Sequence, residues 1–385
     1  MAAAPFRHVE AERTLLFGRG ALAEAAGLLG DGYTLLTTPR AAEAAPLVRA
    51  GAARVIEVPS GKVDEVAGDL LVGGVALGPP GTLLVALGGG RVIDVAKALA
   101  AAAGAGLAGG SPGAGSSEVG VGTPSPHAVA AIPTTLSGAE MTRGHRHARG
   151  VPAETPRVRP SIVLNDPALS ASHELSELAA SSANALGHVL IALTSSRTTP
   201  FAAAVAAEAA RQFARAWEPL ATASGGASGV GGAAPSGGAG AVGTADLPDP
   251  ARDEVALGAL LAGWAVDHSG LGLQHVLAQT AVRSAGAGHA QANAALLPES
   301  IAALRRRLPA PLDSLDAQLP ISLEQLSRLL RETTGGDGLT ALARDEALLD
   351  RVVAAAVART AELTRTPPPP DADELRRIYR AAAAA

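Results

Sequence analysis

The sequence predicts an α/β domain followed by an all-helical domain, and three observations lead to this fold class. The chain has 385 residues, more than a single hydrophobic core usually serves. Between Thr14 and Pro133, short apolar β-type runs alternate with alanine-rich helical patterns, which is typical of βαβ units and a parallel sheet. After Asp166 the pattern changes to long helical segments. We therefore expect an α/β domain over residues 1–165 and a helical domain over 166–385.

The elements of the α/β half follow one another in a regular order. Strands are predicted in TLLFG, YTLLTT, ARVIEV, TLLVALGGG and AVAAIP, because each is a short apolar run bounded by glycine, proline or polar residues. Helices are predicted between them, in GALAEAAGLLG, AAEAAPLVRAG and residues 63–75. In the second half, ELSELAASSANALGHVLIAL and SLEQLSRLLRET have helical spacing, and TPPPP at 366–370 separates a short last helix from the rest.

Composition excludes several classes of protein. The net charge of −5 gives no electrostatic reason to expect binding to nucleic acid or to an anionic membrane, so a small molecule is the expected partner. The absence of cysteine excludes disulfides, thiolate catalysis and cysteine metal sites, and it agrees with a cytoplasmic enzyme. No signal peptide or membrane span is expected. Aromatic residues make up only 2%, so the core should consist mainly of Leu, Val and Ala.

Two stretches of low complexity interrupt the pattern. Residues 104–126 and 222–245 are rich in Gly, Ser, Ala and Pro and lack the apolar spacing that buries surface. We expect both to be flexible insertions, one in each domain.

Two motifs of the α/β half are suited to a dinucleotide. In LLVALGGGRVIDVAKALA a buried strand ends at Gly88, Gly89 and Gly90 and a helix follows, so that the backbone and the helix N-terminus can approach a pyrophosphate. Asp94 either stabilises the N-terminus of this helix, orients the glycine loop or contacts the cofactor. In AVAAIPTTLSGAEMT, a strand ends in hydroxyl groups that suit a polar ligand, with Thr134 and Thr135 first among them.

These motifs resemble those of the iron-containing alcohol dehydrogenase superfamily, and the form IPTTLSGAEMT is most similar to maleylacetate reductases. The resemblance continues, in the expected order, through RPSIVLNDPALS, SSANALGHVLIAL, LGLQHVLAQT and AGHAQANAALLPES. It implies a Rossmann-like N-terminal domain, a helical C-terminal domain of the dehydroquinate synthase-like type, an active site in the cleft between them and possible homodimers.

The resemblance also assigns roles to residues. It implies that Gly88, Gly89, Gly90 and Asp94 hold the cofactor pyrophosphate, and that Thr134 and Thr135 lie near the adenine or nicotinamide end. It places the adenosine ribose near Thr37. No acidic residue stands there to bind a ribose 2′-hydroxyl or to repel a 2′-phosphate, so NAD(H) and NADP(H) both remain open.

The same resemblance implies a site of one acid and three histidines for a divalent metal, Fe or Zn. The corresponding residues here are Asn184, His188, His275 and His289. Asn184 replaces the carboxylate, which lowers the affinity for a divalent cation, and asparagine is the form associated with maleylacetate reductases. Metal occupancy therefore stays open.

Further departures concern catalysis. Gln279 stands where a histidine is common in the family and cannot exchange a proton at neutral pH, so general acid or base work must come from elsewhere. The expected catalytic residues are His188, His275 and His289, and His275, if it does not bind a metal, is the best replacement for the missing histidine. Arg91, Ala290 and Glu299 also depart from the family pattern. The segment TRGHRHARG is expected to be a basic solvated loop, in which Arg146 or Arg149 is available to an acidic substrate.

Three functional hypotheses follow. The first is an NAD(P)H-dependent reductase of the maleylacetate reductase type, which delivers a hydride to a small unsaturated oxo acid. The second is a metal-dependent alcohol or aldehyde dehydrogenase with the same fold. The third is a cofactor-binding protein with impaired catalysis, consistent with Gln279 and Glu299.

Overall fold

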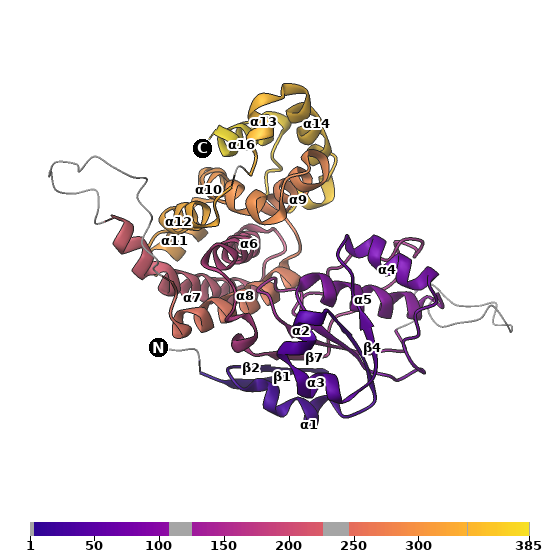
Figure 1. Cartoon of the computed structure of the whole chain (residues 1–385). Coiled ribbons are helices and arrows are strands. Elements are labelled where there is room, and N and C mark those ends of the chain that lie inside the picture. The colour runs from indigo at the N-terminus through magenta and orange to yellow at the C-terminus, as the bar shows by residue number, and fades with distance from the viewer. Residues whose placement is uncertain (1–3, 108–124, 226–245, 337, 385) are drawn as a thin grey trace, which may run out of the picture. The chain divides into compact units, whose positions relative to one another are not determined.

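The computed structural model describes residues 4–107, 125–225, 246–336 and 338–384. The chain divides between Ser172 and His173 into two compact units, each with its own packing (Figure 1). The predicted boundary lies between residues 165 and 166. The short 3-10 turn η2 (Pro167–Ser170) goes with the first unit, where the Asp166 carboxylate accepts hydrogen bonds from the backbone N–H groups of Gly20 and Leu22.

The first unit is built on a seven-stranded sheet with the order β1-β2-β7-β6-β5-β3-β4. Only β1 and β2 pair antiparallel, as a hairpin at one edge, and all other pairs are parallel. The strands are β1 (Phe6–Glu10), β2 (Arg13–Phe17), β3 (Tyr33–Thr37), β4 (Ala52–Glu57), β5 (Leu84–Gly88), β6 (Val129–Pro133) and β7 (Ile162–Asn165).

Helices cover both faces of this sheet, because successive side chains of a strand point to opposite sides. In β5, Leu84 and Ala86 belong to the apolar cluster under α4 (Val63–Val72) and α5 (Gly90–Gly104). Val85 and Leu87 belong to the opposite cluster. That cluster is covered by η1 (Ala21–Glu24), α1 (Ala25–Leu29), α2 (Pro39–Ala44) and α3 (Pro46–Ala50).

The connectivity creates a switch point at the carboxyl edge of the sheet. From β3 the chain crosses to β4 at one edge, whereas from β5 it crosses to β6 on the other side. β3 and β5 are neighbours, so the loops that follow Thr37 and Gly88 diverge to opposite faces. In open α/β sheets, ligands bind in the crevice that such divergence leaves.

The second unit consists of helices in the part of the chain that the structure describes. At its centre lies α6 (Leu175–Thr194), which packs most extensively against five other helices and begins with a capping box between Glu174 and Glu177. Those five are α7 (Pro200–Gly225), α8 (Asp249–Ser269), α9 (Leu273–Ala285), α10 (His289–Arg307) and α12 (Leu323–Thr334). The others are α11 (Pro309–Asp316), α13 (Thr340–Arg344), α14 (Glu346–Val357), α15 (Thr360–Leu363) and α16 (Ala372–Ala384).

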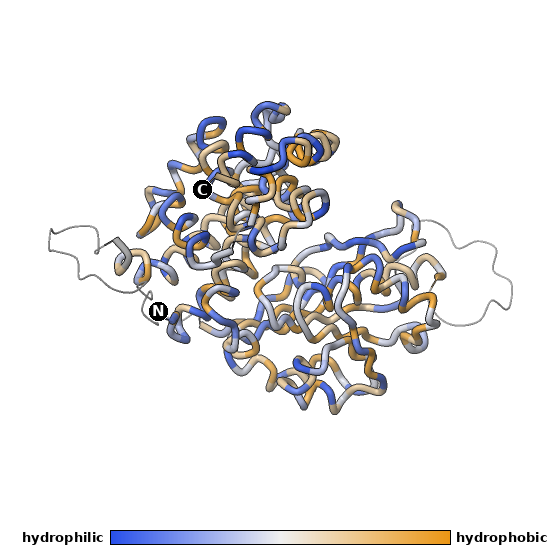
Figure 2. The backbone as a smooth tube through the Cα atoms, turned by 45° about the horizontal axis from the view of Figure 1, so that its top comes forward, coloured by the Kyte–Doolittle hydropathy of each residue, from blue (hydrophilic) through white to orange (hydrophobic). Residues whose placement is uncertain are grey.

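The predicted fold class is confirmed, and so is a core built mainly from Leu, Val and Ala. Figure 2 shows hydrophobic positions, in orange, running through the interior of both units. The sequence prediction missed β1, whose side chains are largely exposed, and it also missed the four-residue strand β7. Most of each predicted insertion lies outside the described residues, although α7 continues through residues 222–225. Among the described residues, no helix has both the length and the apolarity that a membrane span requires.

Candidate functional site

The turn from β5 to α5 is shaped by glycine. Gly88 has a φ of +158°, and a Cβ atom there would lie 2.7 Å from a methyl group of Val92. Gly89 is the N-cap of α5, and Gly90 is its first residue. The backbone therefore turns directly into a helix whose first N–H groups and positive dipole end lie at the carboxyl edge of the sheet.

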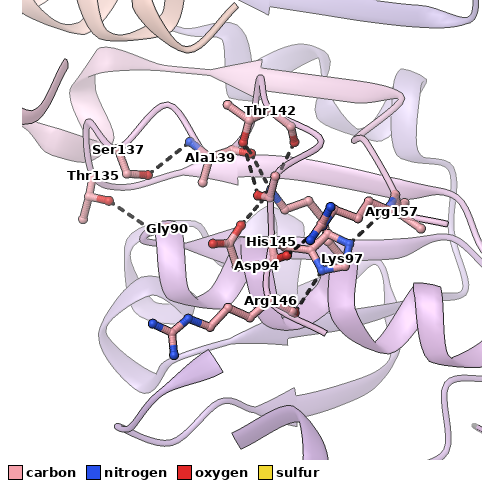
Figure 3. Close-up of polar contacts among 12 residues, drawn as sticks. Gly90, Asp94, Lys97, Thr135, Ser137, Ala139, Thr142, His145, Arg146 and Arg157 are labelled. Atoms are coloured by element: carbon pink, nitrogen blue, oxygen red, sulfur yellow. Dashed lines mark hydrogen bonds and ion pairs between the residues drawn. The ribbon is translucent and has the colours of Figure 1, made fainter. Parts of the chain in front are cut away.

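The loop after β6 packs closely against this turn. The backbone N–H of Thr134 donates to the carbonyl of Gly88 at 3.0 Å, and that of Gly90 donates to the hydroxyl of Thr135 at 3.2 Å. A Cβ atom on Gly90 would lie 2.6 Å from the Ser137 hydroxyl oxygen, so the two loops approach as closely as they do only because residue 90 has no side chain (Figure 3). The cofactor residues predicted from both motifs are thus brought together at the N-terminus of α5, where the first N–H groups and the dipole of a helix favour an anion such as a phosphate.

Lys97 ties α5 to the segment that follows this loop. Its side chain is fully buried, and its ammonium group forms an ion pair with Asp94 at 2.6 Å. It also donates to three backbone carbonyls, those of Ala139, Thr142 and Gly144, at 3.0–3.1 Å (Figure 3). Burial raises the pKa of Asp94, and Lys97 opposes that rise. Asp94 therefore contacts the segment of residues 139–144 only indirectly, through its ion pair with Lys97.

Glu140 is a buried carboxyl group beside this network. It is 1% exposed, and one of its oxygens accepts from the amide of Asn165 at 3.4 Å. The other oxygen has no hydrogen-bond partner among the described residues. Burial raises the pKa of Glu140 to about 7, although its own backbone N–H and the Lys97 charge lower it.

Thr37, at the end of β3, is buried, and its hydroxyl donates to the carbonyl of Thr38. Thr38 is the N-cap of α2, where its hydroxyl accepts from the N–H of Ala41. Thr37 thus lies at the switch point, with its own hydroxyl engaged within the chain. No acidic side chain follows it within the first turn of α2.

The segment from Arg143 to Arg159 differs from the expected solvated loop. His145 is buried, its Nε2 accepts from the N–H of Val158, and burial lowers its pKa to about 3. Arg146 forms an ion pair with Asp64 at 3.3 Å, and Arg149 pairs with Asp69 at 2.5 Å. The prediction of a solvated loop is therefore wrong for His145, because this side chain is buried and accepts a hydrogen bond from the backbone. Both arginines bind α4 carboxylates.

The second unit brings the three predicted catalytic histidines together. His188 lies on α6, His275 on α9, and His289 is the first residue of α10. The rings of His188 and His275 are 5.8 Å apart between centroids. A close approach of α9 to α6 makes this possible, because a Cβ atom on Gly187 would lie 2.8 Å from the Gln274 side chain.

The surroundings of the three imidazoles favour their neutral form. Burial lowers the pKa of His188 to about 4, that of His275 well below its ordinary value, and that of His289 as well. The neighbouring histidines lower the first two pKa values further. The Nδ1 atom of His188 is buried without a partner among the described residues, which leaves one ring nitrogen for a ligand to satisfy.

The side chains around these rings do not fit a divalent metal. Nε2 of His275 lies 2.6 Å from the amide nitrogen of Gln279, and Nε2 of His289 lies 3.3 Å from that of Asn293. Asn184, one turn before His188 on α6, brings no negative charge. Within the described ranges, no group of three or more His, Cys, Asp or Glu residues is arranged to hold a metal ion.

Several residues of this histidine cluster were missed by sequence reasoning. Gln274 donates to the carbonyl of Asn293 and accepts from Ser300, so it holds α9 against α10. Arg359 contacts Gln279 across 80 residues of chain. Gln274 lies within the motif LGLQHVLAQT, but nothing in the sequence marks Arg359.

Comparisons with known proteins agree with this architecture. The family described as iron-containing alcohol dehydrogenase matches residues 13–167, and the C-terminal domain of the Fe-containing alcohol dehydrogenase family matches residues 243–383. No curated protein sequence gives a significant match.

Solved structures give the same fold. An iron-containing alcohol dehydrogenase from Thermococcus thioreducens has a TM-score of 0.75 at 21% identity, over 98% of this chain and 100% of that one. Maleylacetate reductase from Agrobacterium tumefaciens has a TM-score of 0.70 at 24% identity, over 99% and 98%. Sulfoacetaldehyde reductase from Bifidobacterium kashiwanohense, solved with NAD+, has a TM-score of 0.72 at 20% identity, over 99% of each chain.

Proposed function

The chain belongs to the iron-containing alcohol dehydrogenase family, and from this premise we propose that it is an NAD(P)H-dependent reductase of the maleylacetate reductase type. Its substrate is then a small unsaturated oxo acid. The observation that carries the proposal is the chemical character of the histidine cluster. Its imidazoles favour the neutral form, two of their ring nitrogens contact side-chain amides, and Asn184 stands where a metal-binding carboxylate would be expected.

The charges around the cluster support an acidic substrate. Besides the histidines themselves, the groups that act on the pKa of His275 are Arg359 and Arg283, and both lower it. Glu362 offsets the charge of Arg359, and Arg283 adds a further positive charge, so the site favours carboxylates over a divalent cation. Imidazole N–H groups donate hydrogen bonds to carbonyl and carboxylate oxygens, and a carboxylate close by raises the pKa of an imidazole so that it can supply a proton.

The first unit supports the cofactor half of the proposal. The glycine cradle at Gly89 and Gly90, the N-terminus of α5 and the switch point between β3 and β5 together suit a pyrophosphate. When bound, a nicotinamide cofactor supplies the hydride. The residues at the end of β3 suit either nucleotide, so both belong in the assay.

The test is oxidation of NADH and NADPH by the purified protein with maleylacetate and with simple aldehydes, each after EDTA treatment and after addition of zinc or ferrous iron. We expect turnover of maleylacetate that resists EDTA. Reduction of aldehydes that depends on metal would instead assign the protein to the metal-dependent alcohol dehydrogenases, and cofactor binding without turnover would indicate impaired catalysis.

A pair of variants locates the activity. His275→Gln removes a group that we place in contact with substrate, and we expect a loss of kcat of about 100-fold or more, the usual contribution of a general acid or base. His268→Gln is the matched control, because His268 is an exposed histidine stacked on Trp264. Equal activity of the two variants would contradict the assignment.

A further inference from the structure

A chain of polar contacts leads from the histidine cluster to the start of α15. Nε2 of His275 lies 2.6 Å from Nε2 of Gln279, one turn later on α9. The Gln279 oxygen accepts from Nη1 of Arg359 at 2.8 Å. Arg359 also donates to Glu362 through Nε at 3.2 Å and Nη2 at 2.7 Å. Four side chains are thus connected in one line.

The chemistry of these groups fixes the direction of every bond. A guanidinium only donates, so the Gln279 atom that faces Arg359 must be the amide oxygen. The amide NH2 then faces His275, and it also only donates. Nε2 of His275 must therefore be the acceptor, and in a neutral ring the proton lies on Nδ1. Turning the amide over would place two donors 2.8 Å apart at Arg359.

The pair Arg359 and Glu362 is held firmly enough to impose this order. Arg359 is only 17% exposed and Glu362 23% exposed, and the two groups are three residues apart at the start of α15. Helix α15 itself packs against α9, which carries both His275 and Gln279. The guanidinium is thus anchored on one helix and reaches the amide of another.

We propose that Arg359 is a positioning residue that acts through Gln279 and holds His275 in the tautomer with its proton on Nδ1. The lone pair of Nε2 is occupied, and Nδ1–H is the donor that this ring offers. Its relevance to catalysis rests on the proposed function, in which His275 contacts the substrate. The tautomer itself does not depend on that function.

The experiment is side-chain 15N NMR of the free full-length protein labelled at its nine histidines, at a fixed neutral pH. The His275 signals are assigned by their absence in His275→Gln. We expect the Nδ1–H tautomer to dominate in the wild type. In Arg359→Met the amide is free to turn and offer its oxygen, so the ratio of tautomers should move toward Nε2–H by about fivefold or more, the weight of one ordinary hydrogen bond.

Two further variants make the result specific. Arg283→Met removes another positive charge that acts on His275 and leaves the chain of contacts intact, so its tautomer ratio should match the wild type. Gln279→Glu replaces the amide with a group that can only accept when ionised, and it should favour Nε2–H even if Arg359→Met folds poorly. An unchanged ratio in Gln279→Glu, or in a folded Arg359→Met, overturns the proposal, and a fall in Tm alone does not support it.

Kinetics separate this proposal from the functional one. If the protein reduces maleylacetate, Arg359→Met should lower kcat more than Arg283→Met does, because both remove a positive charge near His275 and only the first frees the amide. Arg359→Lys, which keeps a donor, should recover part of the loss. If the protein does not reduce maleylacetate, the functional proposal fails, and the NMR ratio still decides the role of Arg359.

Discussion

At the scale of single residues, Lys97 shows how a buried charge holds a binding loop. Its ammonium group has four oxygen neighbours, the Asp94 carboxylate and three backbone carbonyls of residues 139–144. A buried charge is tolerated when it is paired and fully hydrogen-bonded, and removing one partner is costly because the others are left unsatisfied.

Lys97→Met should therefore destabilise the protein by about 3–5 kcal/mol, the usual result of breaking a buried pair. Urea denaturation measures this. Lys62→Met is the control, because Lys62 is exposed and pairs only with exposed Glu65, so a change of about 1 kcal/mol or less is expected. Similar losses in both variants would mean that the Lys97 contacts contribute little.

The raised pKa of Glu140 makes the free energy of unfolding depend on pH. Its pKa rises from 4.5 to about 7 on folding, so between these values the folded state holds a proton that the unfolded state has lost. Its contribution to stability is present below pH 4.5, falls as pH rises toward 7, and is absent above.

Glu140→Gln keeps a neutral group that can accept from Asn165 and removes this loss. Above pH 7 we expect the variant to be more stable than the wild type by up to about 3 kcal/mol, with a flatter profile between pH 5 and 8. Unfolding free energies across this range test the prediction. Glu154→Gln, an exposed site with the same change of charge, should leave the slope as it is.

At the scale of elements, the turn from β5 to α5 has two reasons to contain glycine. One is internal, because a Cβ atom on Gly90 would collide with Ser137, and the other is the approach of a pyrophosphate. A pair of substitutions separates them.

Gly90→Ala alone should lower both stability and NADH affinity, the latter by about tenfold or more. Adding Ser137→Gly removes the internal collision and should restore much of the stability. If the phosphate approaches residue 90, the affinity of the double variant stays low, and calorimetry measures it. Full recovery of NADH binding would show that residue 90 matters only for packing.

The sequence was informative about these elements to different degrees. The strands β2, β3, β5 and β6 are buried and apolar, so their pattern could be read, and β4 could be read from its run of β-type residues although most of its side chains are exposed. In contrast, β1 is an exposed edge strand with mixed side chains, and β7 has only four residues. The glycine turn was predictable because three consecutive glycines between a buried strand and a helix indicate a tight turn of the backbone. The partners of Lys97 and the contact between Arg359 and Gln279 were not, because they join positions 42 to 80 residues apart and depend on the final packing.

At the scale of the whole molecule, the residues proposed to bind the cofactor belong to one unit, and the residues proposed to contact the substrate belong to the other. The glycine cradle lies in the first unit, and the three histidines lie in the second. Both tryptophans, Trp217 and Trp264, also belong to the second unit. Trp217 is fully buried and donates to Ser182, so its fluorescence will report the loss of packing in that unit.

This placement gives a prediction for unfolding in the presence of cofactor. NAD+ at about 100 times its Kd stabilises the state that binds it by ~2.7 kcal/mol. Because the cradle belongs to the first unit, we expect the thermal transition followed by far-UV circular dichroism, which reports both units, to shift upward more than the transition followed by tryptophan fluorescence. Equal shifts by both probes would mean that the two units unfold as one, and a shift in fluorescence alone would place the cofactor on the helical unit and contradict the assignment of the cradle.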